Sequence, residues 1–143
     1  MSHNDICPQD HLQHLFTGAS GIVDRAAQLL VAMQARSRSV SHKELRDIVT
    51  DADIAAEELL IDGLRKLTPE ADILAEETGE TPGNGRSGTA PLRWIVDPLD
   101  GTVNYANGLP LYSVTVAAQE GGETVLGIVQ SPAVPLAAAF LKG

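Results

Sequence analysis

Two long segments with helical spacing precede a series of strand-like runs, and this order limits the fold. From residue 11 to 35, and again from 51 to 67, apolar residues return every three or four positions. This spacing predicts two amphipathic helices, each with one apolar face. Beyond residue 72 the pattern changes to short runs rich in Val, Ile and Leu. Helices and strands do not alternate regularly, so we predict an α+β fold with both helices packed on one face of an antiparallel sheet.

The second segment allows its two faces to be assigned. Leu59, Leu60 and Leu64 belong to its apolar stripe, which needs the sheet as a partner surface. We expect Thr50 to cap the start of this helix and Pro69 to mark its end. The charged positions are expected to face water: Glu57, Glu58, Asp62, Arg65 and Lys66.

Turn residues divide the remainder of the chain into strands and loops. Glu120-Gly121-Gly122-Glu123 joins two apolar runs and predicts a β-hairpin. Residues 1–10 are expected to form a loose terminus, residues 36–46 a loop, and residues 78–91 a long loop of the kind that is usually functional or disordered. The Ala-rich run 136–141 is ambiguous. Strands are expected near 73–76, 93–97, 111–119 and 124–131.

Composition narrows the class of function. The 143 residues suit one domain, and 43% of them are hydrophobic, which is not a disordered composition. A net charge of −9 argues against a nucleic-acid or anionic-membrane surface, which needs clustered Lys and Arg. The single cysteine, Cys7, and a polar N-terminus without an apolar core of a signal peptide predict a cytoplasmic protein. An acidic protein of this kind repels anionic substrates unless metal ions intervene.

The segment Trp94–Thr102, with the sequence WIVDPLDGT, has the strongest chemical pattern. An apolar strand delivers Asp97, Pro98 is expected to force a turn, and Asp100 follows three residues later. Two carboxylates and the Leu99 carbonyl can then converge, and Mg²⁺ prefers such oxygens. Gly101 and Thr102 open a short helix whose first N–H groups can receive a phosphate. The alternative is an ordinary surface turn, since Asp, Pro and Gly are common turn residues.

Two further acidic segments precede it. In AEETG, Glu76 and Glu77 follow a short apolar run; in a strand they would point to opposite faces, so only one could reach a shared site. A solvated Glu pair is the alternative. In DIVTDAD, Asp53 lies three residues after Thr50, which is also the spacing of a capping box.

Together, in this order and at these intervals, DIVTDAD, AEETG and WIVDPLDGTVNY resemble the inositol monophosphatase family over roughly residues 20–143. The resemblance implies the first half-domain of a layered αβαβα fold. It implies that Glu76 bridges metals, that Asp97 is shared by two metals, that Leu99 offers its carbonyl to the first and that Asp100 binds the second. Asp53 and Thr102 match the pair that orients and activates water, and the amides of Gly101 and Thr102 match the phosphate contacts. Lys43 matches a basic position in a loop near the site, and Glu77 is a further candidate.

The function implied is hydrolysis of a phosphate monoester, foremost inositol monophosphate, by water that two or three Mg²⁺ ions activate, with sensitivity to lithium. Histidinol phosphate, fructose 1,6-bisphosphate and 3′(2′),5′-bisphosphonucleotides are alternative substrates within this class. We expect a small phosphorylated substrate as the partner, neither nucleic acid nor membrane, and a homodimer for the full-length protein.

The sequence departs from the family in one respect. The family chain is about twice as long, and its second half carries a WDxAAG motif whose Asp is another metal ligand. The only tryptophan here, Trp94, belongs to the first half. We therefore expect residues 1–143 to be the N-terminal metal- and phosphate-binding half of such a domain. The alternative is a non-catalytic metal-binding or dimerisation module.

Overall fold

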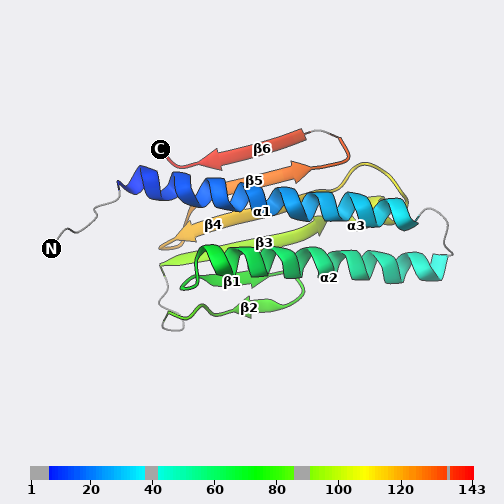
Figure 1. Cartoon of the computed structure of the whole chain (residues 1–143), viewed down its shortest axis with the longest axis horizontal. Helices are drawn as coiled ribbons and strands as arrows, with labels where there is room; N and C mark the ends of the chain where they lie inside the picture. The colour runs from blue at the N-terminus through cyan, green and yellow to red at the C-terminus, as the bar shows by residue number, and fades with distance from the viewer. Residues whose placement is uncertain (1–6, 38–41, 86–90, 135) are drawn as a thin grey trace.

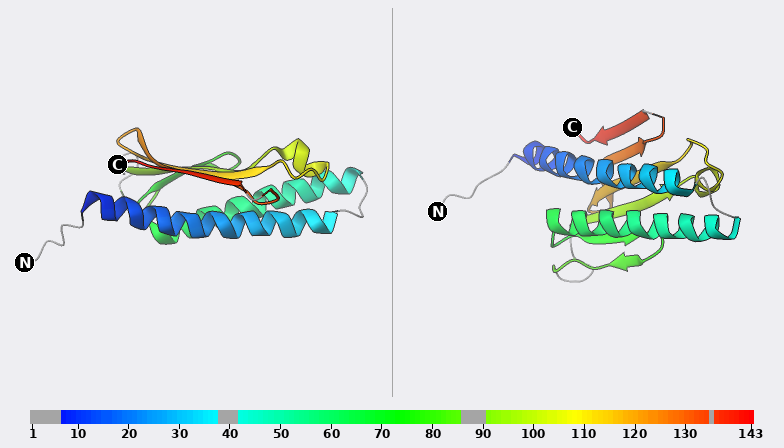
Figure 2. Two further views of the ribbon diagram at one scale, coloured as in Figure 1. Left: turned by 90° about the horizontal axis from the view of Figure 1, so that it is seen from above. Right: turned by 45° about the vertical axis from the view of Figure 1, so that its right-hand side comes forward.

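The computed structural model describes residues 7–37, 42–85, 91–134 and 136–143, without the side chains of residues 42–45 and 48. Two long helices, α1 (Pro8–Arg36) and α2 (His42–Leu67), lie side by side across one face of a six-stranded sheet (Figure 1). The view from above in Figure 2 shows both helices on the same side of that sheet. The prediction of an α+β fold with two helices on one sheet face is confirmed.

The helices begin earlier than predicted. A helix starts at Pro8, inside the expected loose terminus, because proline fits the first helical turn, where its missing N–H is not needed. The start of α2 at His42 lies inside the expected loop 36–46. Thr50 is therefore not a cap: its hydroxyl donates to the carbonyl of Arg46, one turn earlier in the same helix, at 2.9 Å. A Thr hydroxyl can also bond to a carbonyl one turn earlier inside a helix, so the presence of Thr50 does not by itself show where α2 begins.

The two helices approach closely at glycines. A Cβ on Gly63 of α2 would lie 2.8 Å from Cγ2 of Ile22 in α1, and one on Gly18 of α1 would lie 2.6 Å from Cδ1 of Leu67. Between these contacts and the sheet, the predicted core positions Leu60 and Leu64 are fully buried, and Leu59 is partly buried. The predicted packing of the second helix is thus confirmed.

The sheet has the strand order β2-β1-β3-β4-β5-β6. Its strands are β1 (Asp72–Ala75), β2 (Gly79–Thr81), β3 (Leu92–Asp100), β4 (Ser113–Glu120), β5 (Glu123–Ser131) and β6 (Leu136–Leu141). The hairpin between β4 and β5 is confirmed, with Gly121 and Gly122 both at positive φ. The run 136–141, which the sequence left ambiguous, forms strand β6. Strand β2 lies within the segment 78–91, which was predicted to be a loop.

The expectation of an antiparallel sheet is wrong for one pair, since β1 and β3 are parallel. Strand β2 returns antiparallel along β1 and carries the chain back toward the start of β1, so that β3 begins there, with Asp72 opposite Arg93. Parallel neighbours bring their C-terminal ends to one edge. This pairing decides where the acidic residues after β1 and at the end of β3 meet.

The helix-facing side of the sheet is the core. Trp94 is fully buried there, and its indole N–H donates to the hydroxyl of Thr68 at 2.8 Å, just beyond α2. The opposite side, which we call the open face, holds directly paired Leu74, Ile95 and Ala117, all half-buried. Within the described ranges, no helix is long and apolar enough to cross a membrane.

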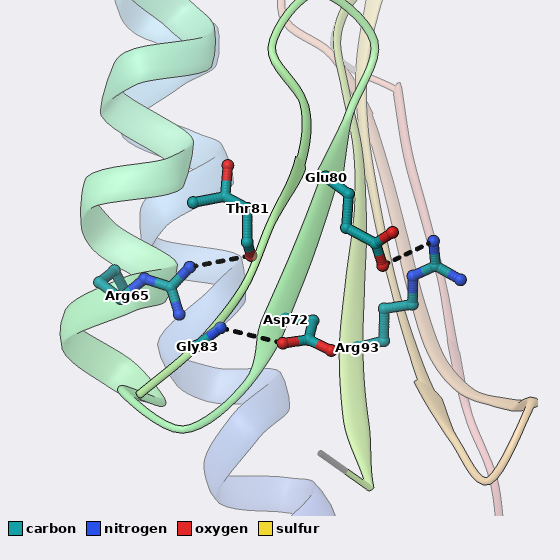
Figure 3. A network of polar contacts seen from close by, with 6 residues as sticks. All are labelled: Arg65, Asp72, Glu80, Thr81, Gly83 and Arg93. Carbon is teal, nitrogen blue, oxygen red and sulfur yellow. Dashed lines mark hydrogen bonds and ion pairs between the residues drawn. The ribbon is translucent and has the colours of Figure 1, made fainter. Parts of the chain in front are cut away.

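Two charged residues of α2 do not face water as predicted. Arg65 donates to the carbonyls of Ala71 and Thr81, the latter at 3.2 Å, and so ties α2 to the strand ends (Figure 3). Glu57 is buried, with 4% of its surface exposed. Helical periodicity alone does not show this, because the backbone groups that satisfy both side chains lie outside α2.

Candidate metal and phosphate site

Three elements bring carboxylates together at one end of the sheet. Because Ala75 in β1 lies opposite Val96 in β3, the next residues on these parallel strands, Glu76 and Asp97, emerge as neighbours. Their side chains are close enough for the charge of Asp97 to raise the pKa of Glu76. Asp53 on α2 lies near enough to Glu76 and Asp97 for their charges to raise its pKa. The structure thus brings together three of the predicted site residues.

These carboxylates repel one another. The charge of Asp97 is the main cause that raises the pKa of Glu76, followed by burial. Burial, and then the charges of Glu77, Glu76, Glu57 and Asp97, raise the pKa of Asp53 to about 6. Opposite charge close by would favour the ionised forms again, which is what a bound cation supplies.

The oxygen atoms that remain without partners fit a hard cation. In the described part of the chain, Oδ1 of Asp53 and Oδ1 of Asp97 are buried and accept no hydrogen bond. Buried polar atoms are rarely left unpaired, and Mg²⁺ takes such oxygens as ligands. Over the same residues, however, no group of three or more His, Cys, Asp or Glu side chains is close enough to hold an ion as it stands. The donors fit Mg²⁺ in chemistry, while their ligand set is not closed.

A hollow on the open face adjoins the acidic pair. Its volume is about 420 Å³, and Glu76, Asp97 and the apolar side chains of neighbouring β1 and β3 residues line it. A ligand in this hollow would contact both carboxylates. The turn 76–78 at its rim is not a strand, so the expectation that Glu76 and Glu77 point to opposite faces of a sheet does not apply; both are exposed.

Strand β3 does not turn at Pro98 as predicted. It continues to Asp100 with a bulge: the ladder advances three residues from Asp97 to Asp100 while β4 advances two, from Thr115 to Ser113. Such bulges re-aim side chains near functional sites. Asp100 is exposed at the end of the strand and does not contribute to the pKa shifts of Asp53 or Glu76. The carbonyl of Leu99 accepts the Thr102 hydroxyl at 3.4 Å.

Gly101 makes the tight backbone turn that leads into helix α3 (Thr102–Ala106). Its φ of 85° is in the left-handed region, and a Cβ there would lie 2.7 Å from the carbonyl oxygen of Leu111. Only glycine meets both conditions without strain. The predicted short helix after Gly101 is therefore present.

Hydrogen bonds between α1 and α3 hold the short helix α3 in place. The Tyr105 hydroxyl donates to the Leu30 carbonyl at 2.7 Å, and Gln34 Nε2 donates to the carbonyls of Tyr105 at 3.1 Å and Leu109 at 3.3 Å. The rings of Tyr105 and Tyr112 meet edge to face, with centroids 4.8 Å apart. These contacts hold the segment that carries Gly101 and Thr102 against the core.

A second hollow separates α2 from α3. It has a volume of about 280 Å³ and is lined by Arg46, Val49, Thr50, Thr102, Val103 and Ala106. Val49 and Thr50 lie within one helical turn of Asp53, although Asp53 itself does not line this hollow. The side chain of Lys43, the remaining candidate, lies outside the described residues.

Comparison with known proteins gives the family. The sequence profile of the Inositol monophosphatase family matches residues 11–142, which is nearly the whole chain. The chain belongs to the inositol monophosphatase family. This confirms the family that the three acidic segments indicated.

Individual family members agree with this assignment. A Thermotoga maritima protein described as fructose-1,6-bisphosphatase/inositol-1-monophosphatase is 36% identical over 113 residues, which are 78% of this chain and 41% of that protein. The Nus factor SuhB of Escherichia coli K12 is 39% identical over 92 residues, 64% of this chain and 33% of that protein.

Solved structures show the same fold. The extragenic suppressor protein SuhB of Bartonella henselae superposes with a TM-score of 0.77 at 28% identity, over 90% of this chain and 48% of that one. The inositol monophosphatase of Anabaena sp. PCC 7120 gives a TM-score of 0.75 at 27% identity, over 92% and 45%. The chain thus spans less than half the length of the relatives it matches.

Sequence reasoning missed two residues of this region. Glu57 was assigned to the solvent face although it lies four positions after Asp53, and residues spaced in this way share a helix face. That spacing was the available signal. Arg46, which lines the hollow beside Thr102, had none: a single Arg before an apolar stripe is typical of any surface helix.

Proposed function

We propose that this chain supplies the metal- and phosphate-binding half of a Mg²⁺-dependent phosphatase that hydrolyses a phosphate monoester, foremost inositol monophosphate. The convergence of Glu76, Asp97 and Asp53 at the end of the sheet where β3 leads into the Gly101–Thr102 turn is the observation that carries the proposal. Family membership supports the reaction class, while the substrate is inferred from the resemblance of the motifs.

Each residue has a role in this proposal. Glu76, Asp97, Asp100 and the Leu99 carbonyl would hold Mg²⁺, with Glu77 at the rim. When bound, the ions neutralise charge on the phosphate and make water a stronger nucleophile. Catalysis of phosphoryl transfer otherwise depends on positioning, since the transition state is largely dissociative.

The chain's own groups do the positioning. The amides of Gly101 and Thr102 bind the phosphate, with α3 held against α1 by Tyr105 and Gln34. Asp53 accepts a proton from the attacking water, and the Thr102 hydroxyl orients that water.

Other family substrates are the alternatives within this reaction class. The Thermotoga relative is described with two activities, on fructose 1,6-bisphosphate and inositol 1-phosphate. A panel of inositol 1-phosphate, fructose 1,6-bisphosphate, histidinol phosphate and a 3′,5′-bisphosphonucleotide, assayed on the chain joined to a second half, separates them. A homodimer of that full-length protein, with a small phosphorylated substrate and neither nucleic acid nor membrane as a partner, completes the proposal.

Replacement of Asp97 tests the metal assignment. In a protein completed with the second half of a relative, Asp97→Asn should abolish hydrolysis of inositol 1-phosphate, because a charged oxygen ligand that would hold Mg²⁺ is lost. Asp62→Asn, the same chemical change at an exposed site on α2, is the matched control and should retain activity. Retained turnover in Asp97→Asn, or Mg²⁺-independent turnover in the unsubstituted protein, would contradict the metal assignment. No turnover in the unsubstituted completed protein would instead favour a non-catalytic module.

A further inference from the structure

A buried carboxylate on α2 has no part in the chemistry described so far. Glu57 is 4% exposed and lies between the fully buried Ala56 and Leu60 of the core stripe. Carboxylates are almost never buried unless they are paired. Among the described ion pairs none involves Glu57, so its partners must be sought among neutral groups.

Those partners all belong to one turn, residues 76–78, between β1 and β2. Oε2 of Glu57 accepts the N–H of Glu77 at 3.1 Å, and Oε1 accepts the N–H of Thr78 at 3.0 Å. The Thr78 hydroxyl donates to Oε1 as well. Both oxygens are therefore engaged, which leaves Glu57 unsuited to bind a metal itself. Hydrogen bonds from successive amides to a charged acceptor are stronger than neutral ones.

The clamped backbone is the one that carries a candidate ligand. The amide of Glu77 follows directly on Glu76, whose carboxyl group lies close enough to Asp97 for the charge of Asp97 to raise its pKa. Without a restraint, the charge of Asp97 would drive Glu76 away, since the two carboxylates repel each other. Gly79, which follows the turn 76–78, has a φ of 75° and has no side chain that could hold the turn.

The rest of this hairpin is fixed elsewhere. Arg65 binds the carbonyl of Thr81 at the end of β2, Asp72 at the start of β1 accepts the Gly83 N–H at 2.9 Å, and Glu80 pairs with Arg93 at 3.1 Å (Figure 3). Two of these three contacts hold the end of the hairpin opposite the turn. Among the described side chains of α2, Glu57 is the one that hydrogen-bonds to the turn itself.

We propose that Glu57 is a positioning residue, whose carboxylate fixes the backbone of residues 76–78 so that Glu76 lies beside Asp97 in a geometry that binds a divalent cation. One helix then carries the proposed base, Asp53, and, one turn later, the clamp on a metal ligand. The inference rests on the proposed function, because it assumes that Glu76 binds metal.

The test compares two isosteric variants of neighbouring glutamates. Glu57→Gln removes the charge and turns an NH₂ group toward the turn amides, whereas Glu58→Gln makes the same change at an exposed position. Mn²⁺ serves as the probe in place of Mg²⁺, with free ion measured by electron paramagnetic resonance on the 143-residue chain. We expect Glu57→Gln to weaken Mn²⁺ binding by about 10- to 100-fold, the range for residues that orient metal ligands. Glu58→Gln should bind like the unsubstituted chain.

A second readout separates positioning from loss of charge. In the metal-free proteins, hydrogen exchange at the Glu77 and Thr78 amides should be faster in Glu57→Gln than in Glu58→Gln. Thr78→Ala removes one donor from an exposed residue and should weaken Mn²⁺ binding less than Glu57→Gln does. Thr78→Ser keeps a hydroxyl donor and should restore Mn²⁺ binding to that of the unsubstituted chain. This pair carries the test if Glu57→Gln does not fold.

The outcomes are distinct. Unchanged Mn²⁺ affinity in Glu57→Gln, or weaker binding with unchanged exchange at both amides, would overturn the role of Glu57 and leave the proposed function standing. Failure of the unsubstituted chain to bind Mn²⁺ at millimolar concentration would overturn the proposed function, and this inference with it.

Discussion

Mutual repulsion among Asp53, Glu76 and Asp97 shapes the behaviour of individual residues. Each of these side chains would be an ordinary surface acid if it stood alone. Placed together and partly withdrawn from water, they make the ionised cluster unfavourable, as the raised pKa values of Asp53 and Glu76 show. A bound cation offsets the repulsion among the carboxylates. The cluster therefore lowers the stability of the metal-free chain and raises its affinity for a cation.

The metal-free chain should therefore lose stability as the pH rises from about 4 to about 6. The folded-state pKa of Asp53, about 6, exceeds the ordinary value of 3.8, so between these values the folded state binds more protons than the unfolded state. Stability then falls with increasing pH in this window. Glu76 contributes in the same direction. Urea unfolding, followed through the fluorescence of the buried Trp94, measures the effect.

Asp53→Asn provides the matching variant. It should flatten this pH dependence and be more stable than the unsubstituted chain at pH 7 without metal, because the repelled charge is gone. Asp51→Asn, two residues earlier and exposed, changes the net charge equally and should not flatten it. Identical pH profiles for the two variants would contradict the assignment.

Gly101 is the residue whose backbone position is most constrained. Gly101→Ala should lower the free energy of unfolding by more than ~2 kcal/mol, since the left-handed conformation alone costs roughly 1–2 kcal/mol for a residue with a Cβ, and the Leu111 carbonyl oxygen stands 2.7 Å away. Gly122→Ala is the control: its φ of 83° is nearly the same, but no atom lies within 4 Å of the added Cβ. Equal losses in both would show that the close approach to Leu111 is not significant.

At the scale of elements, the contact between α1 and α2 depends on where glycine stands in a helix. Glycine costs ~1 kcal/mol relative to alanine inside a helix, so Gly→Ala stabilises wherever space allows. Gly21 of α1 has no atom near its added Cβ, whereas Gly63 of α2 faces three carbons of Ile22, at 2.8 to 3.1 Å. Ile22 is branched at Cβ and cannot easily move aside.

We therefore expect the same substitution to act with opposite sign on the two helices. Gly21→Ala should raise the free energy of unfolding by roughly 0.5–1 kcal/mol, and Gly63→Ala should lower it by about 1–3 kcal/mol, as is typical of overpacking. Chemical denaturation of both variants under the same solution condition measures the two changes in the free energy of unfolding. Stabilisation by Gly63→Ala would mean that the helices can separate slightly without loss.

A buried hydrogen bond joins the loop after α2 to strand β3. The Trp94 indole N–H donates to the Thr68 hydroxyl, which donates in turn to the Leu64 carbonyl at 3.0 Å. Thr68→Val keeps the shape but leaves the indole unpaired, which should cost about 1–3 kcal/mol. Thr50→Val, at an exposed helical hydroxyl, should change stability by less than ~0.5 kcal/mol. Similar effects at both positions would contradict a special role for this bond.

On the scale of the whole molecule, the open face has few polar side chains at its far edge. Alternation along the strands places Val129, Leu136 and Phe140 on this side, and Leu136 is 67% exposed and Phe140 51% exposed. The outer strand β6 also leaves one backbone edge unpaired within the described sheet. Apolar surface beside a free edge favours association.

We expect the 143-residue chain alone to self-associate and to have little or no phosphatase activity. Its ligand set is not closed, and misplacement of a reacting group by about one ångström can reduce a rate roughly a hundredfold. Sedimentation measures association, and hydrolysis of inositol 1-phosphate with millimolar Mg²⁺ measures activity. A monomer that turns over substrate as fast as a full-length family member would contradict both expectations.

The sequence by itself determined most of the helices and strands and the chemistry they carry. Helical spacing identified α1 and α2, the Gly-Gly pair identified the β4–β5 hairpin, and WIVDPLDGT identified a strand that ends in acidic residues beside a glycine turn. These features are local: hydrophobic period and turn chemistry depend on neighbours within a few positions. For the same reason the family could be inferred from short motifs.

Only the tertiary structure decided how those pieces meet. The parallel pairing of β1 with β3 places Glu76 beside Asp97, and no local pattern distinguishes a parallel from an antiparallel partner for a strand as short as β1. The bulge that carries β3 through Pro98 depends on its pairing with β4. Glu57 looked like a solvent-facing charge, yet it is buried because the donors that satisfy it come from a turn twenty residues further along the chain. Periodicity shows which side chains avoid water, whereas the burial of a charge depends on distant backbone groups that only the folded chain brings to it.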